Sequence, residues 1–185
     1  MISFLFVFVY LMSCMHAEIQ VTEFGHQSYD LQESYDVFTI GDPVQIGAWV
    51  KPPDIYICNG TPITIQRVSK ALNYWKKLGY NFGIIYEDVI CIQERDMNTI
   101  KISLPDNTFV EPNLAMTRTA RITSTQEIVA AHVFIHAFAV SKERVLEHEI
   151  GHALGWQHYS RKYHIMHPNW NYGGHDDKGL KVEAD

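Results

Sequence analysis

The chain has 185 residues, of which 46% are hydrophobic and 19% charged, and its formal net charge is −6. This length favours one domain with a hydrophobic core, and the composition is that of a globular protein rather than a disordered chain. No basic run is present, and binding to phosphates requires clustered Lys and Arg, so the composition argues against a nucleic-acid partner.

Residues 1–17 are predicted to be a signal peptide. The segment is almost wholly apolar, ends in the small residue Ala17, and is too short to span a bilayer comfortably. It lacks a charged n-region, so a buried N-terminal strand or helix is the alternative. A lipoprotein signal with Cys14 as the anchored residue is a second alternative. We therefore expect a secreted or otherwise extracytoplasmic protein, periplasmic or extracellular, with a membrane as partner only if Cys14 is lipidated.

Removal of this leader would leave two cysteines, Cys58 and Cys91. An oxidising compartment would join them, because exported proteins form disulfides from even numbers of cysteines. The bridge would close a loop of about 33 residues and stabilise the fold by about 3–4 kcal/mol on the chain-entropy model. The alternative is a pair of buried free thiols.

Residues 18–50 have no clean period and are consistent with an N-terminal arm, a short pro-segment or irregular packing. Further along, apolar residues at helical spacing predict a helix over residues 61–80, with Thr61 as N-cap and Gly79 as the stop. A second helix is predicted over 141–154, with Ser141 as its cap. Alternating or continuous apolar runs predict five strands, at residues 54–58, 81–88, 99–105, 116–123 and 126–137.

This order of elements predicts an α/β (α+β) fold. We expect a twisted mixed five-stranded sheet, a packing helix, a late second helix that carries the chemistry described next, and a short C-terminal subdomain. No internal repeat or low-complexity linker divides the chain, so one domain is the simplest organisation.

Histidines near the C-terminal end have a spacing that suits a metal ion. His148 and His152 are four residues apart in the predicted helix, so they lie on one face and can direct two imidazoles at one point. Glu149 lies beside that point, where a carboxylate can reach a metal-bound water without occupying a coordination position. This is the arrangement of zinc hydrolases, with two helix ligands and the Glu as general base.

A third histidine, His158, can reach the same ion only if the helix ends before it. A continued helix would carry it about 9 Å along the axis from His152, and Gly155 stands where a left-handed C-cap would end the helix. Three neutral imidazoles and one open water position describe a catalytic zinc rather than a structural one. We therefore predict one catalytic zinc on His148, His152 and His158. The alternative, that these histidines share no role, requires the pattern HExxHxxGxxH to arise by chance.

The segment HEIGHALGWQH resembles the extended zinc motif of the metzincin metalloproteases, and HIMHP resembles the methionine-containing turn of their matrixin branch. The resemblance implies that Met166 forms the hydrophobic floor of the site and is not a ligand. It also implies that His167, Pro168, Asn169 and Trp170 line the pocket for the substrate residue just after the scissile bond. Matrixins usually carry tyrosines there, so His167 and Trp170 are departures from the pattern.

By this resemblance the chain is a zinc-dependent endopeptidase, with residues 51–185 as the catalytic domain and a protein or peptide as substrate. Glu149 would be the general base toward a zinc-activated water. An edge strand within residues 120–131 is expected to pair with an extended substrate. The alternatives are a secreted zinc-binding or adhesion module without turnover, and a zinc amidase acting on cell-wall peptide.

Latency of the usual matrixin kind is not expected, because no cysteine-containing activation motif is present. The segment FTIGD, which ends at Asp42, resembles the aspartate latch of the astacin branch, with its spacing off by one.

Two further sets of residues invite a metal interpretation. His132 and His136 share a face of a predicted strand, so a second, structural metal is one interpretation and ordinary strand packing is the other. Asp176 and Asp177 offer carboxylates to calcium, but two carboxylates without further oxygen ligands do not support such a site. We expect this pair to cap a short helix instead.

Overall fold

The computed structural model describes residues 17–27, 41–91, 96–109 and 113–182. Apart from Ala17, the predicted leader, including Cys14, lies outside the described residues. Within the described part of the chain, no helix has the length and apolar character required to cross a bilayer.

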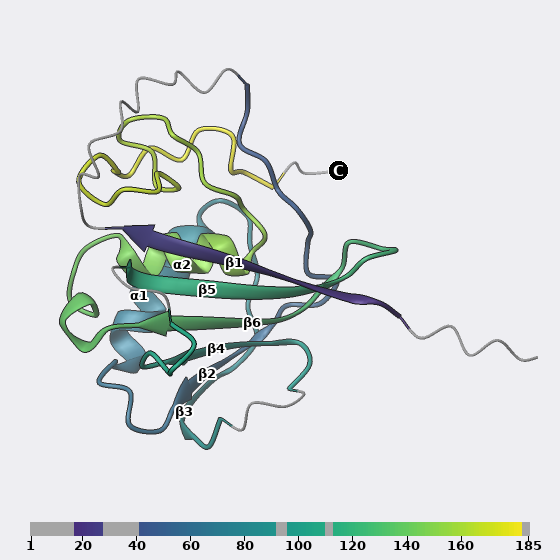
Figure 1. The fold of residues 1–185 in the computed structure, drawn as a ribbon, viewed down its shortest axis with the longest axis vertical. Helices are drawn as coiled ribbons and strands as arrows, with labels where there is room; N and C mark the ends of the chain where they lie inside the picture. The colour runs from purple at the N-terminus through teal and green to yellow at the C-terminus, as the bar shows by residue number, and fades with distance from the viewer. Residues whose placement is uncertain (1–16, 28–40, 92–95, 110–112, 183–185) are drawn as a thin grey trace, which may run out of the picture.

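A six-stranded mixed sheet forms the centre of the molecule, in the spatial order β1-β5-β6-β4-β2-β3 (Figure 1). Strands β2, β3, β4 and β6 are parallel to one another, whereas β5 runs antiparallel to both of its neighbours, β6 and β1. In chain order the strands are β1 (Ile19–Gln27), β2 (Asp54–Cys58), β3 (Ile85–Val89), β4 (Thr99–Ser103), β5 (Asn113–Ile122) and β6 (Ile128–Ile135).

The five predicted strands are present, and the sixth strand, β1, comes from the N-terminal arm, to which the sequence assigned no structure. It pairs along the outer side of β5, from Ile19 opposite Ile122 to Gln27 opposite Asn113. The expected edge strand within residues 120–131 was therefore placed wrongly. That segment holds the end of β5, a turn and the start of β6, and β6 lies inside the sheet.

Two helices, α1 (Ile65–Lys76) and α2 (Val145–Ala153), pack on one face of the sheet (Figure 1). They also hold each other. The buried Trp75 donates its indole N–H to the Glu147 carbonyl oxygen at 2.7 Å, and Arg67 makes a two-pronged ion pair of 2.8 and 2.7 Å with the Glu147 carboxylate. Paired in this way, Glu147 is buried at low cost. These contacts fix the position of α2 over the sheet.

Both predicted N-caps were wrong. Helix α1 begins after Thr64, whose side chain accepts the Arg67 N–H, whereas Thr61 ends the turn that leaves β2, with its N–H bonded to the Cys58 carbonyl oxygen. Helix α2 follows a 3₁₀ turn (Ala137–Ala139, η1) and begins after Arg144, which has a left-handed φ of 70° and no side-chain cap.

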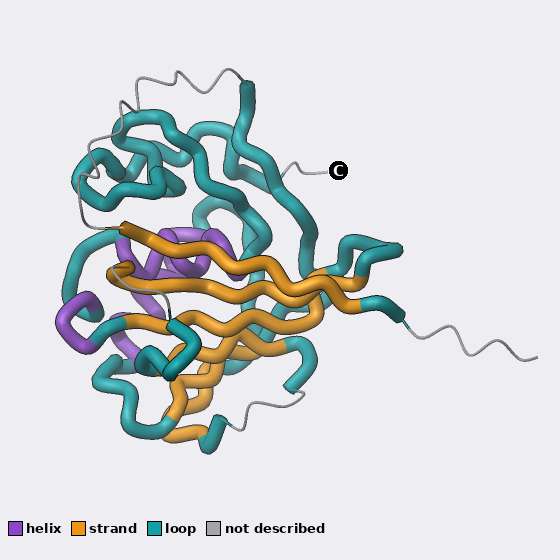
Figure 2. The backbone as a smooth tube through the Cα atoms, in the orientation of Figure 1, coloured by secondary structure: helices purple, strands orange, loops and turns teal. Residues whose placement is uncertain are grey.

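The chain after α2 forms a subdomain made of loops and turns, as Figure 2 shows. Tyr80 donates its hydroxyl to the Leu180 carbonyl oxygen at 3.1 Å, which ties this subdomain to the segment after α1. The expectation that Asp176 and Asp177 cap a short helix was wrong, because none follows α2 in the described residues. Asp176 instead pairs with Arg161 at 2.8 Å.

The predicted disulfide is present between Cys58, at the end of β2, and Cys91, just after β3. It joins two neighbouring parallel strands at one side of the sheet and closes the loop that contains α1. The alternative of two free thiols does not apply to this structure.

On the sheet face opposite the helices, His132 packs against its own strand neighbours rather than a metal. Its Nε2 lies 2.8 Å from the Ser103 hydroxyl, and its ring stacks on Phe134 at 4.0 Å. His136 stacks on Phe138 at 5.0 Å. Neither histidine belongs to a metal-binding group among the described residues, which supports the packing interpretation. Burial, followed by the charge of Lys101, lowers the pKa of His132 to about 4.

Replacing both Cys58 and Cys91 with alanine should lower the free energy of unfolding by about 3–4 kcal/mol, because the unfolded chain loses a closed loop. Urea unfolding of the two proteins measures the difference. Metal content should stay the same, since the bridge lies in β2 and β3, which do not carry the histidine cluster. A loss below about 1 kcal/mol would contradict the loop-closure estimate.

His132 should make the fold sensitive to acid. Its pKa is about 4 when folded and about 6.5 when unfolded, so between these values the unfolded state binds more protons and stability falls as the pH falls. The His132→Gln variant should therefore lose about 2 kcal/mol less than the wild type between pH 7.5 and pH 5. Urea unfolding at both pH values provides the test, and equal losses would exclude this role.

Candidate metal centre

Helix α2 carries two buried histidines whose free nitrogens meet. His148 and His152 have no exposed surface, and their Nε2 atoms lie 2.9 Å apart. Each Nδ1 donates to a backbone carbonyl oxygen, that of Ile165 for His148 and that of Trp156 for His152, both at 2.7 Å. These bonds hold the proton on Nδ1, so each Nε2 presents a lone pair to the other.

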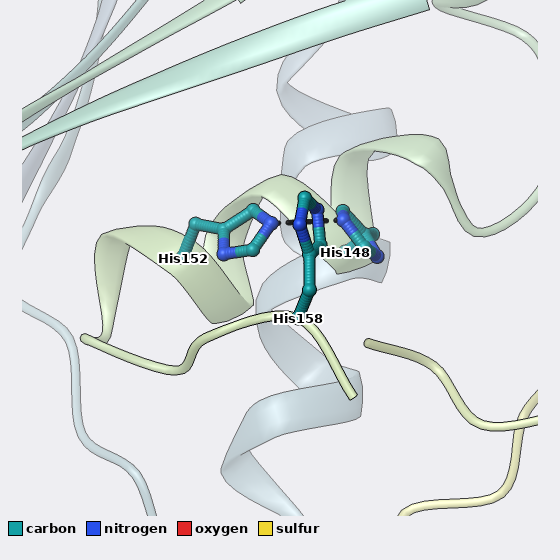
Figure 3. Close-up of side chains that lie close together, drawn as sticks. All are labelled: His148, His152 and His158. Atoms are coloured by element: carbon teal, nitrogen blue, oxygen red, sulfur yellow. Dashed lines mark hydrogen bonds between the residues drawn. The ribbon is translucent and has the colours of Figure 1, made fainter. Parts of the chain in front are cut away.

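The helix ends so that a third imidazole reaches the same point. Gly155 has a φ of +94°, which only glycine adopts without strain, and its N–H donates to the His152 carbonyl oxygen at 2.9 Å. The chain then reverses and brings His158 back, as Figure 3 shows. The ring centroid of His158 lies 4.6 Å from that of His152 and 5.4 Å from that of His148. The predicted bend and the predicted convergence are both present.

These three histidines fit a zinc ion. Their ligand atoms all lie within 4.8 Å of one another, and the His158 Nε2 is buried without a hydrogen-bond partner. Two facing lone pairs and an orphaned nitrogen are unfavourable unless a cation lies among them. Burial is the main cause that lowers the pKa of all three, for His158 to about 4, so the rings are neutral ligands at neutral pH. Three neutral imidazoles are a donor set of catalytic zinc sites.

Glu149 lies beside this cluster and is fully buried. Its Oε2 accepts the Thr117 hydroxyl at 2.5 Å, whereas its Oε1 has no hydrogen-bond partner. Burial raises the pKa of Glu149 to about 8, and the Thr117 bond opposes that rise. The carboxyl group is therefore held by one oxygen and free at the other.

Met166 lies under the ligand helix. It is fully buried, and its sulfur packs so closely on Gly151 that a Cβ at Gly151 would overlap it. Its carbonyl oxygen accepts the Tyr159 N–H at 2.9 Å, which joins the methionine turn to the segment that carries His158. This position suits the predicted floor of the site.

Among the four predicted pocket residues, His167 is buried, and after burial its charge is a further cause that lowers the pKa of His158. Asn169 is buried and donates its N–H to the His167 Nδ1 at 3.0 Å, while Pro168 is half-buried. Trp170 is held by the loop before α2, donating to the Glu143 carbonyl oxygen at 2.9 Å.

Two residues that sequence reasoning missed, Phe24 and His26, cover the cluster from β1. The Phe24 ring stacks on His152 at 4.2 Å, and the His26 ring stacks on His148 at 3.8 Å. His26 Nδ1 also lies 3.8 Å from Glu149 Oε1. The only sequence signal for this strand is the alternation of Thr22, Phe24 and His26. It is too short, and too closely flanked by polar residues, to predict a strand. Asp42, whose segment resembles the astacin latch, is exposed and belongs to no metal-binding group among the described residues.

The turn at Gly155 yields a test of the site's construction. An alanine there would need a left-handed backbone and would overlap the Gly47 carbonyl oxygen, so Gly155→Ala should cost about 2 kcal/mol or more and weaken zinc binding about tenfold or more. Gly60 is a matched control, with a φ of +78° and open space around it. Gly60→Ala should cost about 1 kcal/mol and leave zinc affinity unchanged. Urea unfolding and zinc titration measure both effects, and equal zinc affinities in the two variants would refute the role of Gly155.

Comparisons with known proteins agree with this geometry. No curated protein matches the chain. The matrixin family profile matches residues 25–185, which include every described element from the end of β1 onward. Because the match covers most of the chain, the protein belongs to the matrixin family.

Proposed function

We propose that this protein hydrolyses peptide bonds of protein substrates, with zinc held by His148, His152 and His158 and with Glu149 as general base. Membership of the matrixin family implies a zinc-dependent endopeptidase. The observation that carries the finer proposal is a buried carboxylate with one free oxygen beside three converging imidazole nitrogens. Binding a metal alone would not require that carboxylate.

When bound, zinc supplies a Lewis acid that lowers the pKa of water toward neutrality and polarises the substrate carbonyl. Glu149 takes the proton from the attacking water and then passes it to the leaving amine. Burial raises the pKa of Glu149, and the positive charge of a bound zinc would oppose that rise and favour the carboxylate form that a base requires.

Thr117 is a positioning residue for this base. Its hydroxyl donates to Glu149 Oε2 at 2.5 Å and also lies 3.2 Å from the Glu149 carbonyl oxygen. One carboxylate oxygen is therefore held by β5, and the other, Oε1, has no hydrogen-bond partner. A proton acceptor fixed in this way needs little reorganisation during the reaction.

Glu149→Gln should keep one zinc per chain and lower kcat/KM by about 10²–10⁴-fold, because the amide cannot accept the proton. Cleavage of a denatured protein, with and without a chelator, and metal analysis give the two readouts. Glu143→Gln is the matched control, since this carboxylate lies exposed just before α2. It should retain full activity.

An active Glu149→Gln enzyme would remove Glu149 from the role of base. A wild-type protein that binds zinc without cleaving would support the binding-module alternative instead. Cleavage confined to cell-wall peptide would support the amidase.

A further inference from the structure

We propose that β1 is an intramolecular inhibitor, which lies along β5 in the place of an extended substrate and covers the metal centre with Phe24 and His26. The proposal rests on the proposed function, because it concerns the regulation of the same site. It assigns the N-terminal strand a role that neither the family match, which begins at Gly25, nor the sequence motifs supply.

The first argument is that β5 is the strand beside the metal centre and that β1 occupies its outer edge. Thr117 and Thr119 of β5 donate their hydroxyls to the Glu149 carboxylate and to the His152 carbonyl oxygen. An extended peptide that reaches the site by strand addition would need the free side of β5. That side is taken by β1 along its whole length, antiparallel, from Ile19 to Gln27.

The second argument is the direction of the β1 side chains. Side chains alternate in a strand, and here the inward set is Thr22, Phe24 and His26. Phe24 is 8% exposed and His26 is 2% exposed, whereas the outward Val21 is 58% exposed. The two inward rings lie flat on the imidazoles of the metal centre, with interplanar angles of 1° on His152 and 13° on His148. The buried side chains of β1 are therefore the two that lie over the metal centre.

The third argument is what His26 does to Glu149. His26 Nδ1 and Glu149 Oε1 are both buried without hydrogen-bond partners and lie 3.8 Å apart. His26, His148 and Glu149 also form a second group that presents ligand atoms within 4.8 Å of one another. The His26 ring thus fills the space next to the free oxygen of the base, where the reacting water and the substrate carbonyl have to enter. With β1 in place, the site is closed to both.

The first half of β1 is held by its backbone pairing with β5 and by an exposed hydrogen bond of 2.8 Å from Arg121 Nη2 to Gln20 Oε1. Ile19 and Val21, in its first half, are more than half exposed. One exposed ion pair, from Glu23 to Arg118 at 2.6 Å, supports the outward face. Exposed pairs of this kind contribute little. The two buried rings therefore make the main apolar contribution of β1 side chains to its attachment.

The main variant removes both rings, Phe24→Ala together with His26→Ala. Turnover of a short peptide substrate should rise at least about tenfold over the wild type, because a larger fraction of the protein has an open site. Val21→Ala is the matched control: it removes an apolar side chain from the same strand on the outward face, and its turnover should equal that of the wild type.

Hydrogen exchange on the metal-free proteins measures whether β1 is paired with β5, and it does not depend on catalysis. Amides of β1 and of the outer side of β5 should exchange faster in the double variant than in Val21→Ala. A synthetic peptide of residues 19–27, added to the double variant, should restore the protection and inhibit turnover competitively. The same peptide with alanine at both ring positions should do neither.

A second variant changes only a surface ion pair, so it still tests the proposal if the double variant folds poorly. Glu23→Arg places like charges opposite Arg118 without touching the site, and it should raise turnover about threefold. Combining it with Arg118→Glu restores opposite charges, and latency should return.

The outcomes separate the two proposals. Faster exchange of β1 in the variants with unchanged turnover would overturn the inhibitor and leave the protease intact. Zinc-loaded wild type and variants that all lack turnover would overturn the proposed function, and the inhibitor with it. Self-cleavage within residues 19–27 on zinc loading, seen as an intact-mass change, would show that β1 is a substrate and not an inhibitor.

Discussion

Two hydrogen bonds, from the Nδ1 atoms of His148 and His152 to backbone carbonyl oxygens at 2.7 Å, are the constraint on which the metal centre depends. They keep the proton on Nδ1 of each ring, so each Nε2 presents its lone pair toward the other histidine. The acceptors lie in the chain after α2, at Trp156 in the turn beyond Gly155 and at Ile165 just before the methionine. The centre is therefore assembled only when the C-terminal subdomain has folded back onto the helix.

The resulting site concentrates unfavourable contacts in one place. Four buried side-chain atoms among the described residues lack a hydrogen-bond partner, and three of them belong to His26, Glu149 and His158. Folded proteins usually satisfy buried polar atoms, so such a cluster marks a place where a ligand acts. The remaining structure supports this arrangement, since the contacts of Glu147 with α1 hold the helix beneath it.

Strand β5 contacts both the proposed base, Glu149, and the proposed inhibitor, β1. On one side its threonine hydroxyls donate to α2, one of them to the Glu149 carboxylate, and its outer edge pairs with β1. A substrate strand and the N-terminal strand would compete for the same backbone groups of β5. While β1 occupies that edge, a substrate would reach neither Glu149 nor the metal-binding histidines. The proposed control by β1 needs no thiol.

The sequence by itself determined the local features. Five strands, two helices, the bend at Gly155 and the ligand spacing follow from short-range periodicity and from the positive φ that only glycine adopts easily. The predicted N-caps Thr61 and Ser141 were wrong because both residues lie in turns that precede the helices. Only the tertiary structure decided the place of β1, because its partners lie some ninety residues away and its alternation is too short to specify a pairing. The position of His26 over Glu149 depends on that pairing, and pairing across such a separation is set by global packing, which local patterns do not encode.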